Sequence, residues 1–334
     1  MAKTPQLRVR SYAGDEDASL VAALLNASRE ADDVRSPLTA EAIKAFLEDA
    51  GASTDPSSDV HLFFLGHELI GYERTRRESW ADGTRVYHIM PFIHPDRRDP
   101  DHLAAVVERI CRYQSEYAQS DPEGAGAFLS AMHGADDKDD IEALTVAGFA
   151  PRHFFFQMSC TLDARPEELD LPADLEIRPT GEEDFRSIYE FDRHIMAGSW
   201  GIEAPTEEHF AWWSEEAFRN PELWHVAWHG NEIVATAAGA IGGTWNPRLG
   251  GEKGEIRFVR VASSRRREGI ATALVSRSLA SLWDTGVRKV FLGVDGTNED
   301  SAVTLYRKLG FVIDSRLTAF CRDASETSAS SLHS

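Results

Sequence analysis

The sequence predicts an α+β fold made of two related domains, each with a mixed, mostly antiparallel sheet flanked by helices. Three observations lead to this prediction. The 334 residues fit two domains at roughly 150 residues each. Similar segments recur in the same order in both halves of the chain. In the second half, strand-like and helix-like patterns alternate with turn residues between them.

The internal repeat consists of four pairs of similar segments. LRVRSY at 7–12 resembles LEIRPT at 175–180, and HELIGYE at 67–73 resembles NEIVATA at 231–237. The segment beginning at Pro91 corresponds to the one at Phe258, and AGFAPRHFFFQMSC at 147–160 corresponds to LGFVIDSRLTAFC at 309–321. All offsets are about 162 to 168 residues, and a constant offset over four pairs indicates a duplicated domain.

The repeat also suggests domain boundaries. We expect an N-terminal domain over 1–162 and a C-terminal domain over 175–323, joined by the polar stretch from Leu162 to Asp174 with its two prolines. The tail over 324–334 has too few apolar residues to pack and is expected to be disordered.

Within the second copy, strands are predicted at 175–178, 224–228, 232–240, 255–261 and 289–294, with a closing strand, interrupted by a break, at 311–321. Helices are predicted at 182–194, 207–217, 269–283 and 301–309, and Gly286 is placed to end the third of these.

Composition excludes several classes of function. The net charge of −20 disfavours nucleic acid as a partner, because phosphate binding needs a basic face. No apolar stretch reaches the ~20 residues needed to span a bilayer, and the N-terminus does not resemble a signal peptide, so a cytoplasmic location and no membrane partner are expected. The three cysteines and the histidines lack metal-ligand spacing, so we expect no metal site and buried, apolar cysteines.

The segment EIRFVRVASSRRREGIAT at 255–272 carries the strongest chemical signal. A strand runs into an arginine-rich turn that opens directly into a helix. Gly269 and Ala271 lack bulk, so backbone N–H groups at the helix N-terminus can approach a diphosphate. The segment lacks the endings of a P-loop and of a dinucleotide-binding motif. An ordinary strand–turn–helix with a solvated basic turn is the alternative.

These residues resemble the GCN5-related N-acetyltransferase (GNAT) family. Arg266 to Ala271 fit the family's signature of arginine or glutamine, two residues, glycine, one residue, then glycine or alanine. Downstream, VDGTNEDSAVTLYRKLGF at 294–311 resembles its second hallmark, carried by Asn298, Ala302, Leu305, Tyr306, Gly310 and Phe311. Among tandem members, the layout resembles that of mycothiol synthases.

The resemblance implies that acetyl-CoA is the cosubstrate. It places the pyrophosphate at Arg266, Arg267, Glu268, Gly269, Ile270, Ala271 and Thr272, and the pantetheine amides along the strand Val259, Arg260 and Val261. Asn298 is either a helix N-cap or a CoA contact, and both readings stay open.

The resemblance also implies two catalytic residues. Tyr306 shares the inward helix face and would protonate the departing CoA thiolate; a packed aromatic without this role is the alternative. Glu255 would accept the amine proton, directly or through water, unless it is only a strand-end carboxylate facing solvent. Asp192, Glu203 and Asp295 are reserve bases.

The first copy departs from the family's pattern. Arg97 and Arg98 remain, but Asp99 and Asp101 place negative charge where phosphate would bind, and Pro100 removes an N–H donor. Thr145 stands where Tyr306 stands in the second copy. We therefore expect the first copy to be structural.

The predicted function is acetyl transfer from acetyl-CoA to a primary amine of a small molecule, by a monomer. Three alternatives remain at this point: mycothiol synthase, an aminoglycoside-type acetyltransferase, and a non-catalytic acyl-CoA-binding module.

Overall fold

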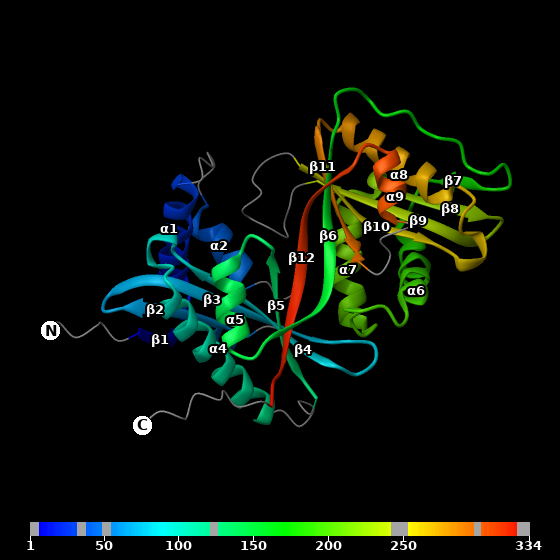
Figure 1. Ribbon diagram of the computed structural model, residues 1–334. Coiled ribbons are helices and arrows are strands. Elements are labelled where there is room, and N and C mark those ends of the chain that lie inside the picture. Colours follow the sequence, from blue (N-terminus) through cyan, green and yellow to red (C-terminus); the bar gives the residue numbers. More distant parts are fainter. Residues whose placement is uncertain are drawn as a thin grey trace. The chain divides into compact units, whose positions relative to one another are not determined.

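The computed structural model describes residues 7–31, 38–48, 55–120, 126–241, 253–296 and 302–325 (Figure 1). The chain divides into two compact units. Unit 1 comprises Met1–His153 together with Leu317–Ser334, and unit 2 comprises Phe154–Arg316. Both units contain the same order of elements, as the repeat predicts. None of the helices in the described part of the chain is long and apolar enough to span a membrane.

Unit 1 is built around a mixed sheet. Its strands are β1 (Leu7–Ser11), β2 (Val60–Leu65), β3 (Glu68–Ser79), β4 (Arg85–Ile93), β5 (Phe128–Gly134) and the C-terminal part of β12 (Val312–Asp323), paired in that order. Pairing is antiparallel except between β4 and β5. The helices are α1 (Asp15–Ala31), α2 (Ala40–Leu47), α3 (Pro56–Asp59), α4 (Pro100–Ser120) and α5 (Lys138–Val146).

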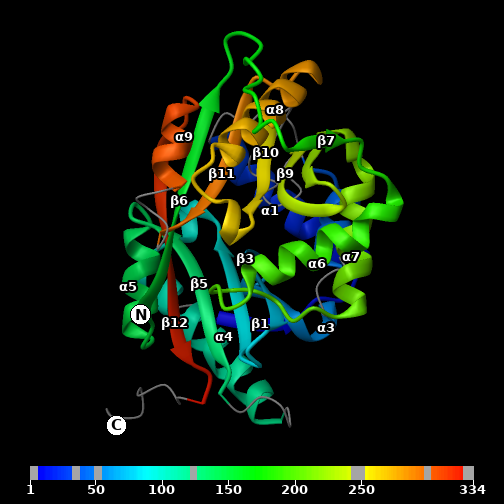
Figure 2. The ribbon, with the colours of Figure 1, turned by 90° about the vertical axis from the view of Figure 1, so that its right-hand side faces the viewer.

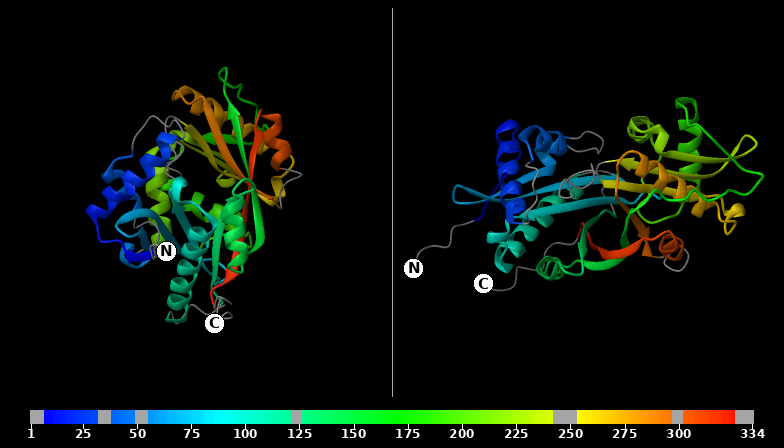
Figure 3. Two further views of the ribbon diagram at one scale, coloured as in Figure 1. Left: turned by 60° about the vertical axis from the view of Figure 1, so that its left-hand side comes forward. Right: turned by 90° about the horizontal axis from the view of Figure 1, so that it is seen from above.

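Two apolar layers cover the sheet of unit 1. Alternate residues of β2 point to opposite faces: Leu62 packs with α1 and α2, whereas Phe63 packs with α4 and α5. The right-hand view of Figure 3 shows the blue helices α1 and α2 on one face and α4 on the other. The period-two pattern of the strands therefore fixes which helices cover each face.

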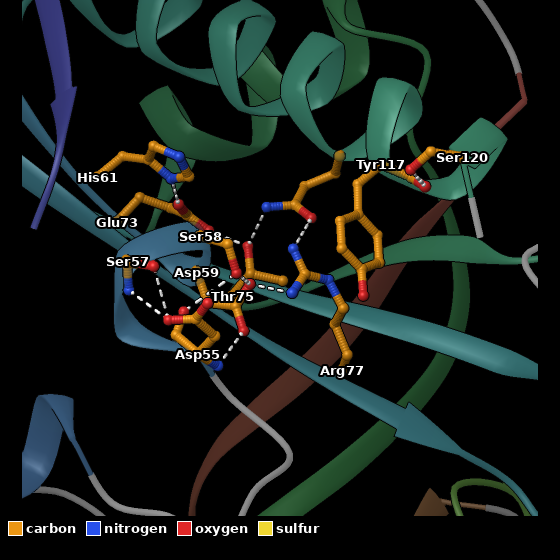
Figure 4. A network of polar contacts seen from close by, with 11 residues as sticks. Asp55, Ser57, Ser58, Asp59, His61, Glu73, Thr75, Arg77, Tyr117 and Ser120 are labelled. Atoms are coloured by element: carbon orange, nitrogen blue, oxygen red, sulfur yellow. Dashed lines mark hydrogen bonds and ion pairs between the residues drawn. The ribbon is translucent and has the colours of Figure 1, made fainter.

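Unit 1 also buries a network of polar side chains beneath α4 (Figure 4). The guanidinium of Arg77 donates to Asp59 and, at 3.0 Å, to Gln114, and Gln114 donates to Thr75 at 2.8 Å. Asp59, Thr75 and Gln114 are each 0% exposed. Burial raises the pKa of Asp59, and Arg77 opposes that rise. The core of unit 1 thus depends on an internally satisfied charge.

Unit 2 repeats this plan. Its strands pair in the order β6 (Ala150–Thr161, C-terminal part), β11 (Lys289–Asp295), β10 (Lys253–Val261), β9 (Glu232–Ile241), β8 (Trp224–His229) and β7 (Glu176–Arg178). Only β10 and β11 are parallel among the described pairs. The helices are α6 (Phe185–Met196), α7 (Glu207–Arg219), α8 (Ile270–Asp284) and α9 (Thr304–Lys308).

The two faces of the unit 2 sheet carry different cores. On one face, Trp213 of α7 and Tyr189 of α6 pack with Trp224 and Phe258 of the strands. On the other face, Leu282 of α8 and Tyr306 of α9 pack with apolar residues of β10 and β11. Figure 2 shows α6 and α7 apart from α8 across the strands. Trp213 and Trp224 are therefore core residues.

The compact units do not follow the predicted boundaries at 162 and 175. Phe155–Thr161, at the end of the first repeat, pair with β11 in unit 2, and Met158 and Cys160 lie in its core. Leu317–Asp323, at the end of the second repeat, pair with β5, and Phe320 lies in the core of unit 1. Each closing strand has 12 residues, about 40 Å, and each is divided between the two units, β6 after His153 and β12 after Arg316.

Three smaller expectations also change. β12 is continuous from Val312 to Asp323, without the predicted break. The stretch from Leu162 to Asp174 is held along α8, because Leu169 N–H donates to Ser276 Oγ at 3.0 Å. Ala324 is 1% exposed and its N–H donates to Ala127, so it belongs to the core, whereas residues 326–334 of the predicted tail lie outside the described residues. The three cysteines are buried and unbridged.

Candidate active site

The parallel strands β10 and β11 separate in the middle of the unit 2 sheet. Their pairing runs only from Lys253 opposite Lys289 to Ile256 opposite Leu292, although β10 continues to Val261 and β11 to Asp295. A register shift in the pairing of β10 with β9 falls between Ile256 and Phe258. Beyond this bulge, one edge of β10 no longer pairs with β11, so its backbone groups can bind an extended ligand.

The same strand leads into the N-terminus of α8. Gly269 is the N-cap residue, with φ 83°, and no described side chain caps this helix end. Arg267 is the only non-glycine residue of the described chain with positive φ, at 72°. Left-handed residues just before a helix turn successive N–H groups toward one point, which favours an anion such as a diphosphate. A glycine suits position 269, because L side chains rarely adopt this φ.

The charged side chains of this loop take different directions. Arg265 pairs with Glu268 and with Asp174, each at 2.9 Å, so Glu268 is held by a cation of its own loop. The Nε of Arg266 donates to the carbonyl of Val261 at 3.4 Å. The remaining backbone positions predicted to contact the pyrophosphate, Ile270, Ala271 and Thr272, form the first turn of α8.

Tyr306 lies in α9 with its side chain buried at 8% exposure. Its ring packs edge to face on Phe311, with centroids 5.8 Å apart, and it belongs to the cluster against which Val259 of β10 packs. Burial raises the pKa of Tyr306 to about 12, and the nearby charge of Arg260 partly opposes this rise. The phenol therefore keeps its proton at neutral pH and lies near the separated part of β10.

Glu255 lies on β10 just before the bulge. Its carboxylate is 35% exposed and accepts from Arg257 Nε at 3.3 Å. Ile256, the next residue, packs with α8, so Glu255 projects to the opposite face of the sheet. Two of the three reserve bases lie elsewhere in unit 2. Asp295 ends β11, and Glu203 Oε2 lies 3.8 Å from His209 Nε2.

Asp192, the remaining reserve, is 3% exposed and held between two arginines. It accepts from Arg260 Nε and from Arg193 Nη2, each at 2.7 Å. A carboxylate engaged by two guanidinium groups is a poor proton acceptor, which argues against Asp192 as the base. Asn298 falls within 297–301, outside the described residues.

The corresponding loop of unit 1 is closed by its own side chains. Asp99 Oδ1 accepts from the backbone N–H of His102 at 3.0 Å and so caps α4, a hydrogen bond that lowers the pKa of Asp99. Arg97 pairs with Glu68 at 2.8 Å, and Arg98 pairs with Asp140. Thr145 donates to the carbonyl of Ile141 at 2.6 Å.

Sequence reasoning missed two contributors to this region of unit 2. Arg193 was overlooked because an arginine on a polar helix face normally points to solvent, and only its adjacency to Asp192 hinted otherwise. Asp174 belongs to the predicted linker, yet it pairs with Arg265 of the loop at 2.9 Å. The Asp174–Arg265 contact joins segments far apart in sequence, which local patterns do not report.

Comparison with known proteins places these features in context. Residues 185–311 match the model of the acetyltransferase (GNAT) family. The chain is 32% identical over 126 residues to a mycothiol acetyltransferase of Corynebacterium efficiens, covering 38% of each protein. It is 27% identical over 254 residues to a mycothiol acetyltransferase of Pseudarthrobacter chlorophenolicus, covering 74% of this chain and 72% of that protein.

Solved structures share the fold over almost the whole chain. A GCN5-related N-acetyltransferase from Sphaerobacter thermophilus superposes with a TM-score of 0.75 at 22% identity, covering 95% of this chain and 96% of its own. A tandem GNAT protein from the clavulanic acid biosynthesis pathway gives 0.68 at 15% identity, covering 96% and 99%. The chain therefore has the fold of these tandem proteins, and residues 185–311 in its second half match the acetyltransferase (GNAT) family.

Proposed function

We propose that unit 2 transfers an acetyl group from acetyl-CoA to a primary amine of a small molecule. The observation that carries this proposal is the separation of β10 from β11 immediately before the uncapped N-terminus of α8. An unpaired strand edge suits the amides of pantetheine, and the helix N-terminus suits the diphosphate. These two features together support the proposal that CoA binds here.

The proposed reaction needs two proton transfers. The amine nitrogen, once deprotonated, attacks the thioester carbonyl, and the C–S bond breaks to release CoA as a thiolate. Tyr306 is buried, holds its proton at neutral pH, and lies in the cluster that contacts β10. We assign it the role of donating that proton to the leaving sulfur.

Glu255 is the proposed acceptor of the amine proton. It projects from β10 toward the face that carries α6 and α7, and its partial exposure leaves room for a bridging water. Its contact with Arg257 at 3.3 Å is long and leaves one carboxylate oxygen available among the described contacts.

A thiol-release assay tests the proposal. Acetyl-CoA is incubated with the full chain and a panel of primary amines, and free CoA is detected as it forms. Amine-dependent release by the wild type, and its loss in Gly269→Asp, would support acetyl transfer. Tight acetyl-CoA binding without release from any amine would instead favour a non-catalytic acyl-CoA-binding module.

A second candidate, mycothiol acetyltransferase, is favoured by the two relatives carrying that name. At 27–32% identity the acceptor of those enzymes is a hypothesis for this chain. The acceptor of the mycothiol acetyltransferases is assayed in parallel with the panel of primary amines. A much higher kcat/KM for that acceptor than for every other amine would favour mycothiol acetyltransferase activity.

A further inference from the structure

Two arginines share one buried carboxylate beside β10. Asp192 of α6 accepts from Arg260 Nε and from Arg193 Nη2, both at 2.7 Å. Arg193 follows Asp192 directly in the helix, and its guanidinium returns to that carboxylate over the ring of Tyr189, 5.6 Å from the centroid. Within this hydrogen-bonded cluster, two cations share one anion.

Part of the donor capacity of this cluster is unused. The Nε of Arg193 is buried and has no hydrogen-bond partner in the described structure. Beyond its bond to Asp192, the only other hydrogen bond of Arg260 among the described residues runs from Nη1 to the carbonyl of Val259 at 3.3 Å. The side chains of Arg193 and Arg260 are 15% and 17% exposed, so part of each remains accessible to solutes.

Such an arrangement is costly unless a second anion binds. Removing a guanidinium group from water carries a large desolvation penalty, and one carboxylate cannot offset it for two such groups. Asp192 fixes the guanidinium planes in advance, so an incoming anion would find ordered donors. Carboxylate and phosphate oxygens match these donors best.

The cluster lies where an acceptor would meet the thioester. Arg260 belongs to the part of β10 that has separated from β11, and its charge acts on Tyr306. On the same face of the sheet, Phe258 packs with α6 and α7. An anion bound to the cluster would therefore be close to the groups proposed for catalysis.

We infer that Arg193 and Arg260, held by Asp192, determine acceptor specificity by binding a carboxylate or phosphate group of the amine substrate. The inference rests on the proposed acetyl transfer and adds the class of acceptor, a primary amine that also carries an acidic group. The overall charge of −20 makes long-range attraction of such a substrate improbable, so recognition is local to these two side chains.

Matched acceptors test this inference. α-Amino acids are compared with their carboxamides, and phosphoethanolamine with ethanolamine, in the thiol-release assay. One charge-assisted contact predicts about 10- to 100-fold higher kcat/KM for the acidic member of at least one pair. The pair that responds distinguishes carboxylate from phosphate.

Variants then locate the effect. Arg193→Gln and Arg260→Gln should each reduce the acid-to-neutral ratio of kcat/KM about tenfold, and Arg260→Lys should restore part of it. Arg186→Gln is the matched control, because Arg186 lies about two helical turns earlier on α6 but pairs with Glu207 at 2.7 Å. It should leave the ratio unchanged.

The outcomes separate the inference from the proposed function. Equal turnover of acidic and neutral amines, or an acid preference that survives both glutamine variants, would overturn the inference and leave acetyl transfer standing. Absence of CoA release with every amine would overturn acetyl transfer, and the specificity inference with it.

Discussion

The carboxylate of Asp99 accepts a hydrogen bond from the backbone N–H of His102 at 3.0 Å, capping the N-terminus of α4. At the equivalent end of α8, Gly269 provides no such cap. The duplicated loops therefore differ in whether the helix N-terminus is available to an outside anion. This difference is the physical basis of the proposal that acetyl-CoA binds to unit 2 alone.

Gly269→Asp should abolish acetyl-CoA binding. The new carboxylate would lie against the phosphates and cap α8 from within, as Asp99 caps α4. Gly269→Asn is the matched control, since asparagine has the same shape, tolerates positive φ and carries no charge. Isothermal titration should find weakened binding for asparagine and none for aspartate. Equal affinities for the two variants would refute the electrostatic argument.

Tyr306→Phe should lower turnover by about 10²-fold or more, because it removes the proposed proton donor to the leaving thiolate. The affinity for acetyl-CoA should barely change, since the ring still packs on Phe311. Steady-state kinetics and titration measure the two effects separately. Full turnover in the variant would mean that another group or water protonates the thiolate.

Glu255→Gln should also lower turnover, but with a distinct pH signature. If the carboxylate accepts the amine proton, its loss should remove the decline of kcat toward acidic pH. Glu232→Gln serves as the comparison, because Glu232 is an exposed carboxylate at the start of β9 with no proposed role. An acidic decline that persists unchanged in Glu255→Gln would exclude this residue as the base.

His225 should make unit 2 sensitive to acid. Burial lowers the pKa of this side chain from 6.5 to about 4. Between about pH 4 and pH 6.5, the unfolded chain binds a proton at His225 that the folded chain does not. The contribution to the free energy of unfolding is therefore fully present above about pH 6.5 and is lost as the pH falls toward 4. The total effect is roughly 3 kcal/mol.

Denaturant unfolding at pH 7 and pH 5 checks this prediction. His225→Gln should reduce the loss of stability between the two pH values. His229→Gln is the control, because the side chain of His229 is 55% exposed. The same pH dependence in wild type and His225→Gln would show that the histidine is not responsible.

Arg77→Leu should destabilise unit 1 by about 3–5 kcal/mol, because it leaves the fully buried Asp59 without its partner. Arg97→Leu removes an exposed pair with Glu68 and should cost less than about 1 kcal/mol. Denaturant midpoints provide the comparison. Similar small losses in both variants would mean that Asp59 is neutral or solvated in the folded state.

Much of the second copy was predictable from local patterns. The strands around 224–241 and the helix over 269–283 depend on residue periodicity and turn residues, and the structure has them within a residue or two. The glycine at position 269 was identifiable because few residues suit a left-handed N-cap before a helix.

What the sequence did not reveal is non-local pairing. Nothing in the segments at 147–160 and 309–321 indicates that Met158 joins the core of unit 2 or that Phe320 joins that of unit 1, because similar strands suit either neighbour. The contact of Arg193 and Arg260 with Asp192 likewise depends on how α6 packs on β10.

The most direct test of the central claim is the stoichiometry of acetyl-CoA binding to the full chain, measured by isothermal titration. We predict a single site per chain, unaffected by Asp99→Asn in unit 1. Two sites per chain, or a change in binding on substitution of Asp99, would contradict the assignment of acetyl-CoA to unit 2.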